Sequence, residues 1–334
     1  AEELARKTVM ENPRLNARQG GALESRRRRV TFLRSQKESE NEIRSALSVM
    51  ADRVATALSQ AEVENGKISP GRLSSLFERV KELNRETYKV INQAFLRLVR
   101  DAVRSGLRTA MASAKVVLDA IKKANEFSAT HPTESEKRTS EAGRWVVILS
   151  EANALRQKVE FSIQDSIFKK LFKGALKKTM QAGLFGSTGV SNRVWDLRDE
   201  NYTRLRRLVG AGIAAGDSAA KISRSVRGLL VQPYTLRGRA RDEASPGQGV
   251  YVSAYKNAMR LTRTESNRAY VSADALFAAE KGWKVVWQVS SGQRKEDSCD
   301  DYNGKEMTPE EFMDIYPLHP HDLCYSIIAV PEVG

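Results

Sequence analysis

The chain has 334 residues, of which 41% are hydrophobic and 29% are charged, and its formal net charge at pH 7 is +14. This length is enough for two domains, or for one elongated helical body with a smaller module. We expect neither a membrane span, which needs about 18 apolar residues, nor a signal peptide, and two cysteines cannot form a secreted disulfide framework, so a reducing cytoplasm is the expected origin.

The first 34 residues are predicted to form a basic arm. Residues 1–37 carry ten Lys or Arg against four acids. The densest part of this segment is a run of four arginines, Arg26, Arg27, Arg28 and Arg29. Such a run predicts contact with DNA or another polyanion through its phosphates. The alternative is that these charges only solvate a long helix.

Residues 35–189 are predicted to form a helical body. Apolar residues recur every three or four positions, which places them on one helix face. The clearest series is Ile43, Leu47, Met50, Val54 and Leu58. After a break at "NGK", Ser69 is expected to cap a second helix, with Pro70 at its first position. Long antiparallel helices are therefore expected, followed by a polar break at 127–141 and a third helix over 141–182.

Residues 190–249 are predicted to be a helical connector that ends in an exposed loop. Asp217 or Ser218 is placed to cap a helix with the apolar face Ala219, Ile222, Val226 and Leu229. The segment 231–249 mixes proline, glycine and charge, which is typical of a loop. Residues 156–241 again carry excess basic charge, with eighteen Lys or Arg against six acids.

Residues 250–334 are predicted to form a small α+β module. A long helix ends at Gly282, and the alternation in "WKVVWQVSS" predicts a strand. Thr308 and Pro309 start a short helix, and "LCYSIIAV" predicts a second, antiparallel strand. The expected fold is therefore mainly α, with a long helical N-terminal body and a small module made of a long helix plus short antiparallel strands.

The candidate metal ligands lie in this module. If its strands pair, four side chains converge in a Cys2His2 arrangement suited to a structural zinc ion: Cys299, His319, His321 and Cys324. Asp297, Asp300 or Asp301 is an alternative ligand in place of a histidine. Such a clip would stabilise a module with little apolar core. The alternative is ordinary packing of buried free cysteines beside turn histidines.

A cysteine–histidine nucleophile is the enzymatic alternative for the same residues. It requires a thiolate, an orienting group and an oxyanion pocket. Cys299 lies among Glu296, Asp297, Asp300 and Asp301 in the sequence, and negative charges oppose thiolate formation. We therefore expect no enzyme, and no hydrolase in particular.

Two further features are assigned from spacing. In "RLTRTESNRAY" (260–270), the charged residues Arg263, Glu265 and Arg268 favour surface pairing along the helix, with bridging to the strands as the alternative. Trp283 and Trp287 are expected to be packing anchors.

The order of these motifs over about 210–330 resembles the phage head morphogenesis domain of minor head proteins similar to phage Mu protein F. The series runs from "GDSAAKISRSV" through "RLTRTESNRAYVSADALFAAEKG" and "KVVWQVSSGQRKEDSCDDYNGK" to "PLHPHDLC". The positions that match the family pattern are Arg263, Thr264, Glu265, Trp287, Cys299, Gly304, Lys305, His319, Pro320 and Cys324. The sequence departs from the family where "LCYS" has one cysteine instead of two.

This resemblance implies a structural virion protein, present in few copies and associated with the portal, in head assembly, DNA packaging or DNA ejection. Its implied partners are the portal protein and other head proteins, in the virion and, during assembly, in the host cytoplasm, with no membrane involved. Arg263, Glu265, Trp287 and Gly304 are then residues that define the module. An internal virion protein that binds packaged DNA is the alternative function.

Overall fold

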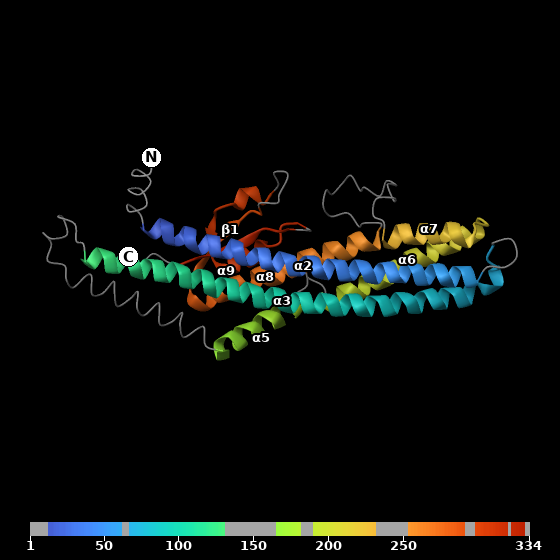
Figure 1. Cartoon of the computed structure of the whole chain (residues 1–334), viewed down its shortest axis with the longest axis horizontal. Helices are drawn as coiled ribbons and strands as arrows, with labels where there is room; N and C mark the ends of the chain where they lie inside the picture. The colour runs from blue at the N-terminus through green and yellow to red at the C-terminus, as the bar shows by residue number, and fades with distance from the viewer. Residues whose placement is uncertain are drawn as a thin grey trace.

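The computed structural model describes residues 13–61, 67–130, 165–181, 190–231, 253–290, 298–319 and 322–330. The elements in chain order are α2 (Pro13–Gln60), η2 (Pro70–Arg72), α3 (Leu73–Thr130), α5 (Asp165–Gln181), α6 (Val190–Ala214), α7 (Ala219–Leu230), α8 (Ala254–Lys281), β1 (Lys284–Gln288), η4 (Asp300–Tyr302), β2 (Glu306–Met307), α9 (Pro309–Ile315) and β3 (Tyr325–Ala329). They form a long helical rod with a small sheet beside it (Figure 1). The predicted fold, mainly α with a small α+β module, is confirmed.

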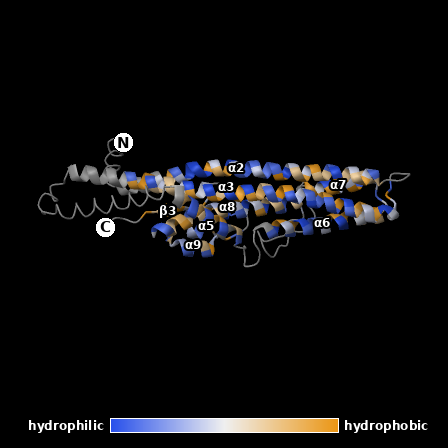
Figure 2. Cartoon of the chain, turned by 90° about the horizontal axis from the view of Figure 1, so that it is seen from below, coloured by the Kyte–Doolittle hydropathy of each residue, from blue (hydrophilic) through white to orange (hydrophobic). Residues whose placement is uncertain are grey.

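The rod is built on the hairpin of α2 and α3. The predicted apolar series of α2, from Ile43 to Leu58, is buried throughout. Along both helices hydrophilic and hydrophobic residues alternate, as expected for helices with one buried side (Figure 2). Ser69 and Pro70 do start the second helix, but through the 3-10 turn η2 before α3 begins.

The predicted boundary at residue 34 lies inside α2, so residues 13–34 belong to the rod and not to a separate arm. The physical reason is that small and apolar side chains continue to face neighbouring helices toward its N-terminal end. A Cβ on Gly21 would lie 2.6 Å from Val117 of α3. Phe32 is buried and stacks on Tyr270 of α8, with ring centroids 4.8 Å apart.

Different helices cover the two halves of the α2–α3 hairpin. The α6–α7 pair packs on the half near the α2–α3 connection, and α5 and α8 pack on the other half (Figure 1). The apolar face predicted for 219–229 is buried, and Ser218 is the N-cap of α7. Asn84 of α3 is hydrogen-bonded to Asn201 of α6 at 2.9 Å and so joins the two helical layers.

Most residues of the helix α8 are buried, and many of them are small. At Gly106 the backbone of α3 comes so close to α8 that a Cβ would lie 2.2 Å from the carbonyl oxygen of Tyr270. This contact fixes where α8 lies along α3. Gly282 ends α8 with a positive φ of 68°, as its position in the sequence predicts.

The module ends in a three-stranded antiparallel sheet of order β2-β1-β3. The central strand β1 pairs Val285 with Met307 on one side and with Ile328 on the other. Thr308 forms a capping box with Glu311 at the start of α9, and Pro309 occupies the first turn. Both predicted strands and the predicted short helix are thereby confirmed.

Several predicted features lie outside the described residues. They are the helix segment 141–164, the loop 232–252 and most of the polar break predicted at 127–141, whose first residues belong to α3 instead. Within the described residues, no helix combines the length and the apolar character that crossing a membrane requires.

Candidate functional site

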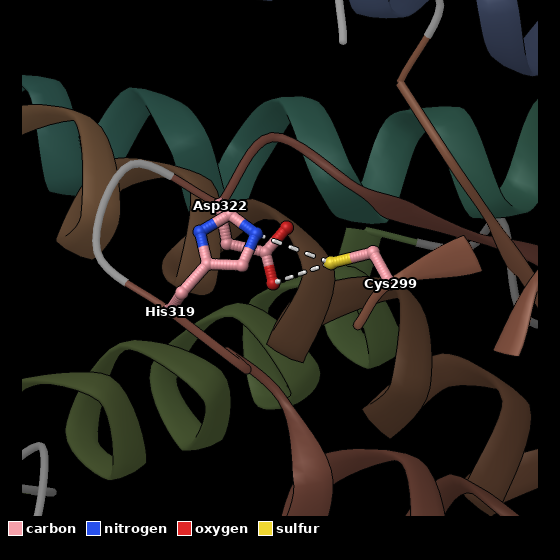
Figure 3. Close-up of side chains that lie close together, drawn as sticks. All are labelled: Cys299, His319 and Asp322. Atoms are coloured by element: carbon pink, nitrogen blue, oxygen red, sulfur yellow. Dashed lines mark hydrogen bonds between the residues drawn. The ribbon is translucent and has the colours of Figure 1, made fainter. Parts of the chain in front are cut away.

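Three side chains that can bind a metal meet in the C-terminal module. Cys299 immediately precedes η4, His319 follows α9, and Asp322 lies just before β3. The Cys299 Sγ atom is 3.3 Å from His319 Nε2 and 3.8 Å from Asp322 Oδ2 (Figure 3). One ligand atom of each residue lies within 4.8 Å of the other two. These three residues are called the Cys-His-Asp cluster below.

Backbone hydrogen bonds hold the Asp322 carboxylate in place. Its Oδ1 atom accepts from the N–H of Cys324 at 2.8 Å, and its Oδ2 atom accepts from the N–H of Leu318 at 3.1 Å. Asp322 and Cys299 are both fully buried, whereas His319 is partly exposed. The Asp322 carboxylate is therefore held by two backbone N–H groups, and His319 is the most exposed member of the cluster.

The structure brings two of the four predicted ligands together and leaves one apart. Cys299 and His319 meet as expected, but the sulfur of Cys324 lies outside the cluster. The reason is a local turn, in which the Asp322 carboxylate accepts from the N–H of Cys324. In this turn the carboxylate of Asp322, and not the sulfur of Cys324, faces Cys299. His321 lies outside the described residues.

Asp322 was not among the predicted ligands, because the acids proposed as ligands all lie near Cys299 in the sequence. The available signal was the position of Asp322 between His321 and Cys324 in "HPHDLC". Of the acids that were proposed, Asp300 and Asp301 are not in the cluster and Asp297 lies outside the described residues.

The cluster does not have the arrangement of a cysteine–histidine nucleophile. In that arrangement an acid orients the imidazole while the thiol faces the substrate. Here the Asp322 carboxylate contacts the thiol itself, and Cys299 is 0% exposed. The sulfur is therefore enclosed in this arrangement and does not face solvent.

The segment that carries the cluster is tied to α8 and α2 through three consecutive carbonyl groups. The side-chain amide of Asn267, on α8, donates to the carbonyls of Asp322 at 2.9 Å and Cys324 at 3.0 Å. Arg29, on α2, donates to the carbonyl between them, that of Leu323, and to the Asn267 side chain. The position of the cluster thus depends on both helices.

Arg29 was predicted to contact DNA, and the structure contradicts this. It is 4% exposed, and its guanidinium lies over the ring of Tyr325 at 4.6 Å. Arg26 contacts the Tyr325 hydroxyl, Arg28 pairs with Glu24, and Arg27 is exposed. Every fourth residue of α2 faces inward here, which is why Arg29, four residues after the buried Ser25, is buried.

The charged residues of α8 connect helices instead of pairing on the surface. Arg263 forms two hydrogen bonds with Glu40 of α2, at 2.7 and 2.9 Å. Glu265 contacts Arg193 of α6, and its other carboxylate oxygen lies 3.8 Å from Arg268. Burial raises the pKa of Glu265 despite these two guanidinium groups. The interpretation as surface pairs is wrong because the spacing of three to five residues also suits a buried junction.

Trp287 and Gly304 shape the core of the sheet. Trp287 is fully buried, and its ring contacts Tyr302, Phe312 and Tyr316, with centroids 4.9 to 5.5 Å away. Gly304 has a φ of 79° and donates its N–H to the Trp287 carbonyl at 2.8 Å. A residue with a Cβ is strained in that conformation. Trp283 is buried as well, so both tryptophans are packing anchors, as expected.

Asp274 should make the stability of the protein depend on pH. Its carboxyl group is buried on α8, accepts from Ser326 at 3.2 Å, and has a pKa raised well above the ordinary 3.8 by that burial. The stabilisation is complete below the unfolded-state pKa and is lost as pH rises through the raised native pKa. Asp274→Asn should flatten this decline and raise the unfolding free energy at pH 7 by about 1–3 kcal/mol.

Denaturant unfolding at pH 4 and pH 7 measures this change. Glu280→Gln, at an exposed position of the same helix, is the control and should leave the pH profile unchanged. Equal pH profiles for the native protein and Asp274→Asn would contradict the prediction.

Comparison with known proteins identifies no relative: no family model, no curated protein and no solved structure matches this chain. Its function is therefore argued from the site and from the motif series alone.

Proposed function

We propose that this chain is a structural minor head protein of a tailed bacteriophage, associated with the portal and acting in head assembly, DNA packaging or DNA ejection. One observation carries the proposal: motif residues behind the family resemblance, taken from separate stretches of residues 263–319, lie together in the C-terminal module. Trp287 and Gly304 build the sheet, Cys299 and His319 connect η4 to the segment before β3, and Arg263 and Glu265 join the module to the rod.

The arrangement of this module supports a structural role over an enzymatic one. Buried ion pairs and contacts between aromatic rings occupy the positions that the motifs mark. The thiol that would serve as a nucleophile is enclosed. A long rod with a module fixed to its side suits a protein that spans between partners in an assembly, such as a portal and the surrounding head proteins.

Particles of the encoding phage test this function. Cross-linking of purified particles, followed by mass spectrometry, should link the chain to the portal protein, and labelling should place a few copies at the portal vertex. Particles assembled without the chain should show defects in DNA content or infectivity. Absence of the chain from proheads and virions, with unchanged assembly, would refute the proposal.

The finer proposal for the Cys-His-Asp cluster is a structural zinc site. With Zn–S near 2.3 Å and Zn–N near 2.0 Å, a tetrahedral angle separates sulfur from nitrogen by about 3.5 Å. The S···N and S···O distances of 3.3 and 3.8 Å lie on either side of this value. Cys299, His319 and Asp322 would hold the ion, which would fasten η4 to the segment before β3.

Metal removal should lower stability, and the two cysteines provide a matched pair of variants. Cys299→Ser should lose bound zinc, whereas Cys324→Ser, whose sulfur lies outside the cluster, should retain it at one ion per chain. At free zinc one hundred times the Kd, binding stabilises the fold by about 2.7 kcal/mol. Elemental analysis and thermal unfolding, with and without a chelator, measure both effects.

His321→Ala in the same assay determines whether this histidine is a further ligand. If it is, the variant should bind zinc more weakly than the native chain. A protein that contains no zinc, and whose melting temperature ignores both zinc and chelator, would refute the metal site. Loss of zinc in Cys324→Ser but not in Cys299→Ser would refute the ligand assignment.

A further inference from the structure

The outward face of α5 is strongly basic. Its inward face packs on the rod through the buried residues Leu171 and Ala175. Lysines at four-residue intervals occupy the opposite, exposed face: Lys169, Lys173 and Lys177. Because residues four apart lie one above the other on a helix, these lysines form a row with steps of about 6 Å.

A second basic row runs along α3 beside the first. Arg100, Arg104 and Arg108 are all exposed and also follow a four-residue spacing. The guanidinium of Arg104 lies 5.7 Å from the ring centre of Phe172 on α5, so the two rows adjoin. Together the six residues are called the α3–α5 basic ridge: Arg100, Arg104, Arg108, Lys169, Lys173 and Lys177.

The ridge holds more positive than negative charge. Arg104 pairs with Asp101 at 3.2 Å. Among the described residues, no carboxylate pairs with Arg100, Arg108, Lys173 or Lys177. Some exposed basic residues elsewhere on the rod do have partners, as in Arg53 with Glu86 and Arg97 with Glu42. The ridge thus carries a net positive charge that can attract an external anion.

We propose that the α3–α5 basic ridge binds double-stranded nucleic acid through its phosphates. Each row advances about 6 Å per charge, close to two phosphate steps of about 3.4 Å along one strand. Axes of packed helices lie roughly 8–10 Å apart, so the two rows form a band of charge and not a single point. Contacts of this kind position a duplex without reading its sequence.

The same face is poorly suited to a membrane. A helix that binds a lipid surface inserts its apolar side, but the apolar side of α5 is packed against the rod. Among the described residues, the large hydrophobic side chains that are exposed lie outside the ridge: Leu23, Val30, Val49, Val90 and Val116. The ridge therefore offers charge without an apolar anchor, which favours a hydrated polyanion.

The test compares two charge-matched triple variants of the full chain in binding to a random-sequence DNA duplex. The ridge variant is Lys169→Gln, Lys173→Gln and Lys177→Gln. The control is Arg79→Gln, Lys81→Gln and Lys89→Gln, at exposed positions of α3 in the other half of the rod. Each phosphate contact adds about 0.9 to the slope of log affinity against log salt concentration. The ridge variant should therefore lower that slope by about 2.7, and the control should leave it nearly unchanged.

Three results would overturn the proposal. One is no measurable binding of the duplex at 50 mM salt. Another is equal loss in both variants, which would show that net charge alone attracts DNA. The third is tighter binding to polyglutamate, or to vesicles that contain phosphatidylserine, than to the duplex, provided that the ridge variant abolishes this binding. Circular dichroism of both variants verifies that the helices remain intact.

Discussion

Replacing Trp287 by alanine should lower the free energy of unfolding by about 3–5 kcal/mol, as expected for the loss of a large buried ring. The indole is fully buried and lies within ring contact of Tyr302, Phe312 and Tyr316. Its removal would leave a cavity between β1 and α9 that these neighbours cannot fill without moving. Guanidinium unfolding followed by circular dichroism measures the effect.

Trp287→Phe is the matched control for this variant. Within the described residues the indole nitrogen makes no hydrogen bond, so phenylalanine loses volume but no polar contact. The control should therefore cost clearly less than the alanine variant. A loss of less than about 1 kcal/mol in Trp287→Ala would contradict the central place of this ring in the module.

Gly106→Ala should be about as damaging, at roughly 3 kcal/mol, which is the upper end of the usual cost of overpacking. The added methyl group would lie 2.2 Å from the Tyr270 carbonyl oxygen and 2.9 Å from the Ala273 Cβ. The first of these is a backbone atom, so α3 and α8 would have to separate. Thermal unfolding of the variant measures the cost.

Gly174→Ala, the same glycine-to-alanine change at another position, should have the opposite effect on stability. Gly174 lies in α5, and nothing is within 4 Å of the position that its Cβ would occupy. Alanine is a better helix former than glycine by about 1 kcal/mol, so this variant should be slightly more stable than the native chain. If Gly106→Ala is as stable as the native chain or more stable, the close approach of α3 and α8 is wrong.

Local patterns predicted the elements well because their causes are local. Thr308 caps α9 and Gly282 ends α8, and both are recognised from a few neighbouring letters. The buried apolar face of α7 likewise follows from a repeat of three and four residues. The mainly α architecture with a terminal sheet was accessible for the same reason.

The contacts between distant segments were not accessible in this way. A run of four arginines has the same composition whether it faces solvent or a partner, and the partner of Arg29 is Leu323, 294 positions later. The charges around Glu265 fit surface pairing and a buried junction equally well by spacing. At the cluster, the turn at Asp322 decides that a carboxylate and not the Cys324 thiol faces Cys299, and no spacing rule predicts that turn.

The distance along the chain between Arg29 and Leu323 also affects how the protein is made. A ribosome adds about 5–20 residues per second, so Arg29 leaves it roughly 15–60 s before Leu323 does. During this time the N-terminal half of α2 lacks its final neighbours on the module, although α3 is already available to it. The later segment therefore completes the burial of the earlier one, and the junction closes only after Leu323 has been synthesised.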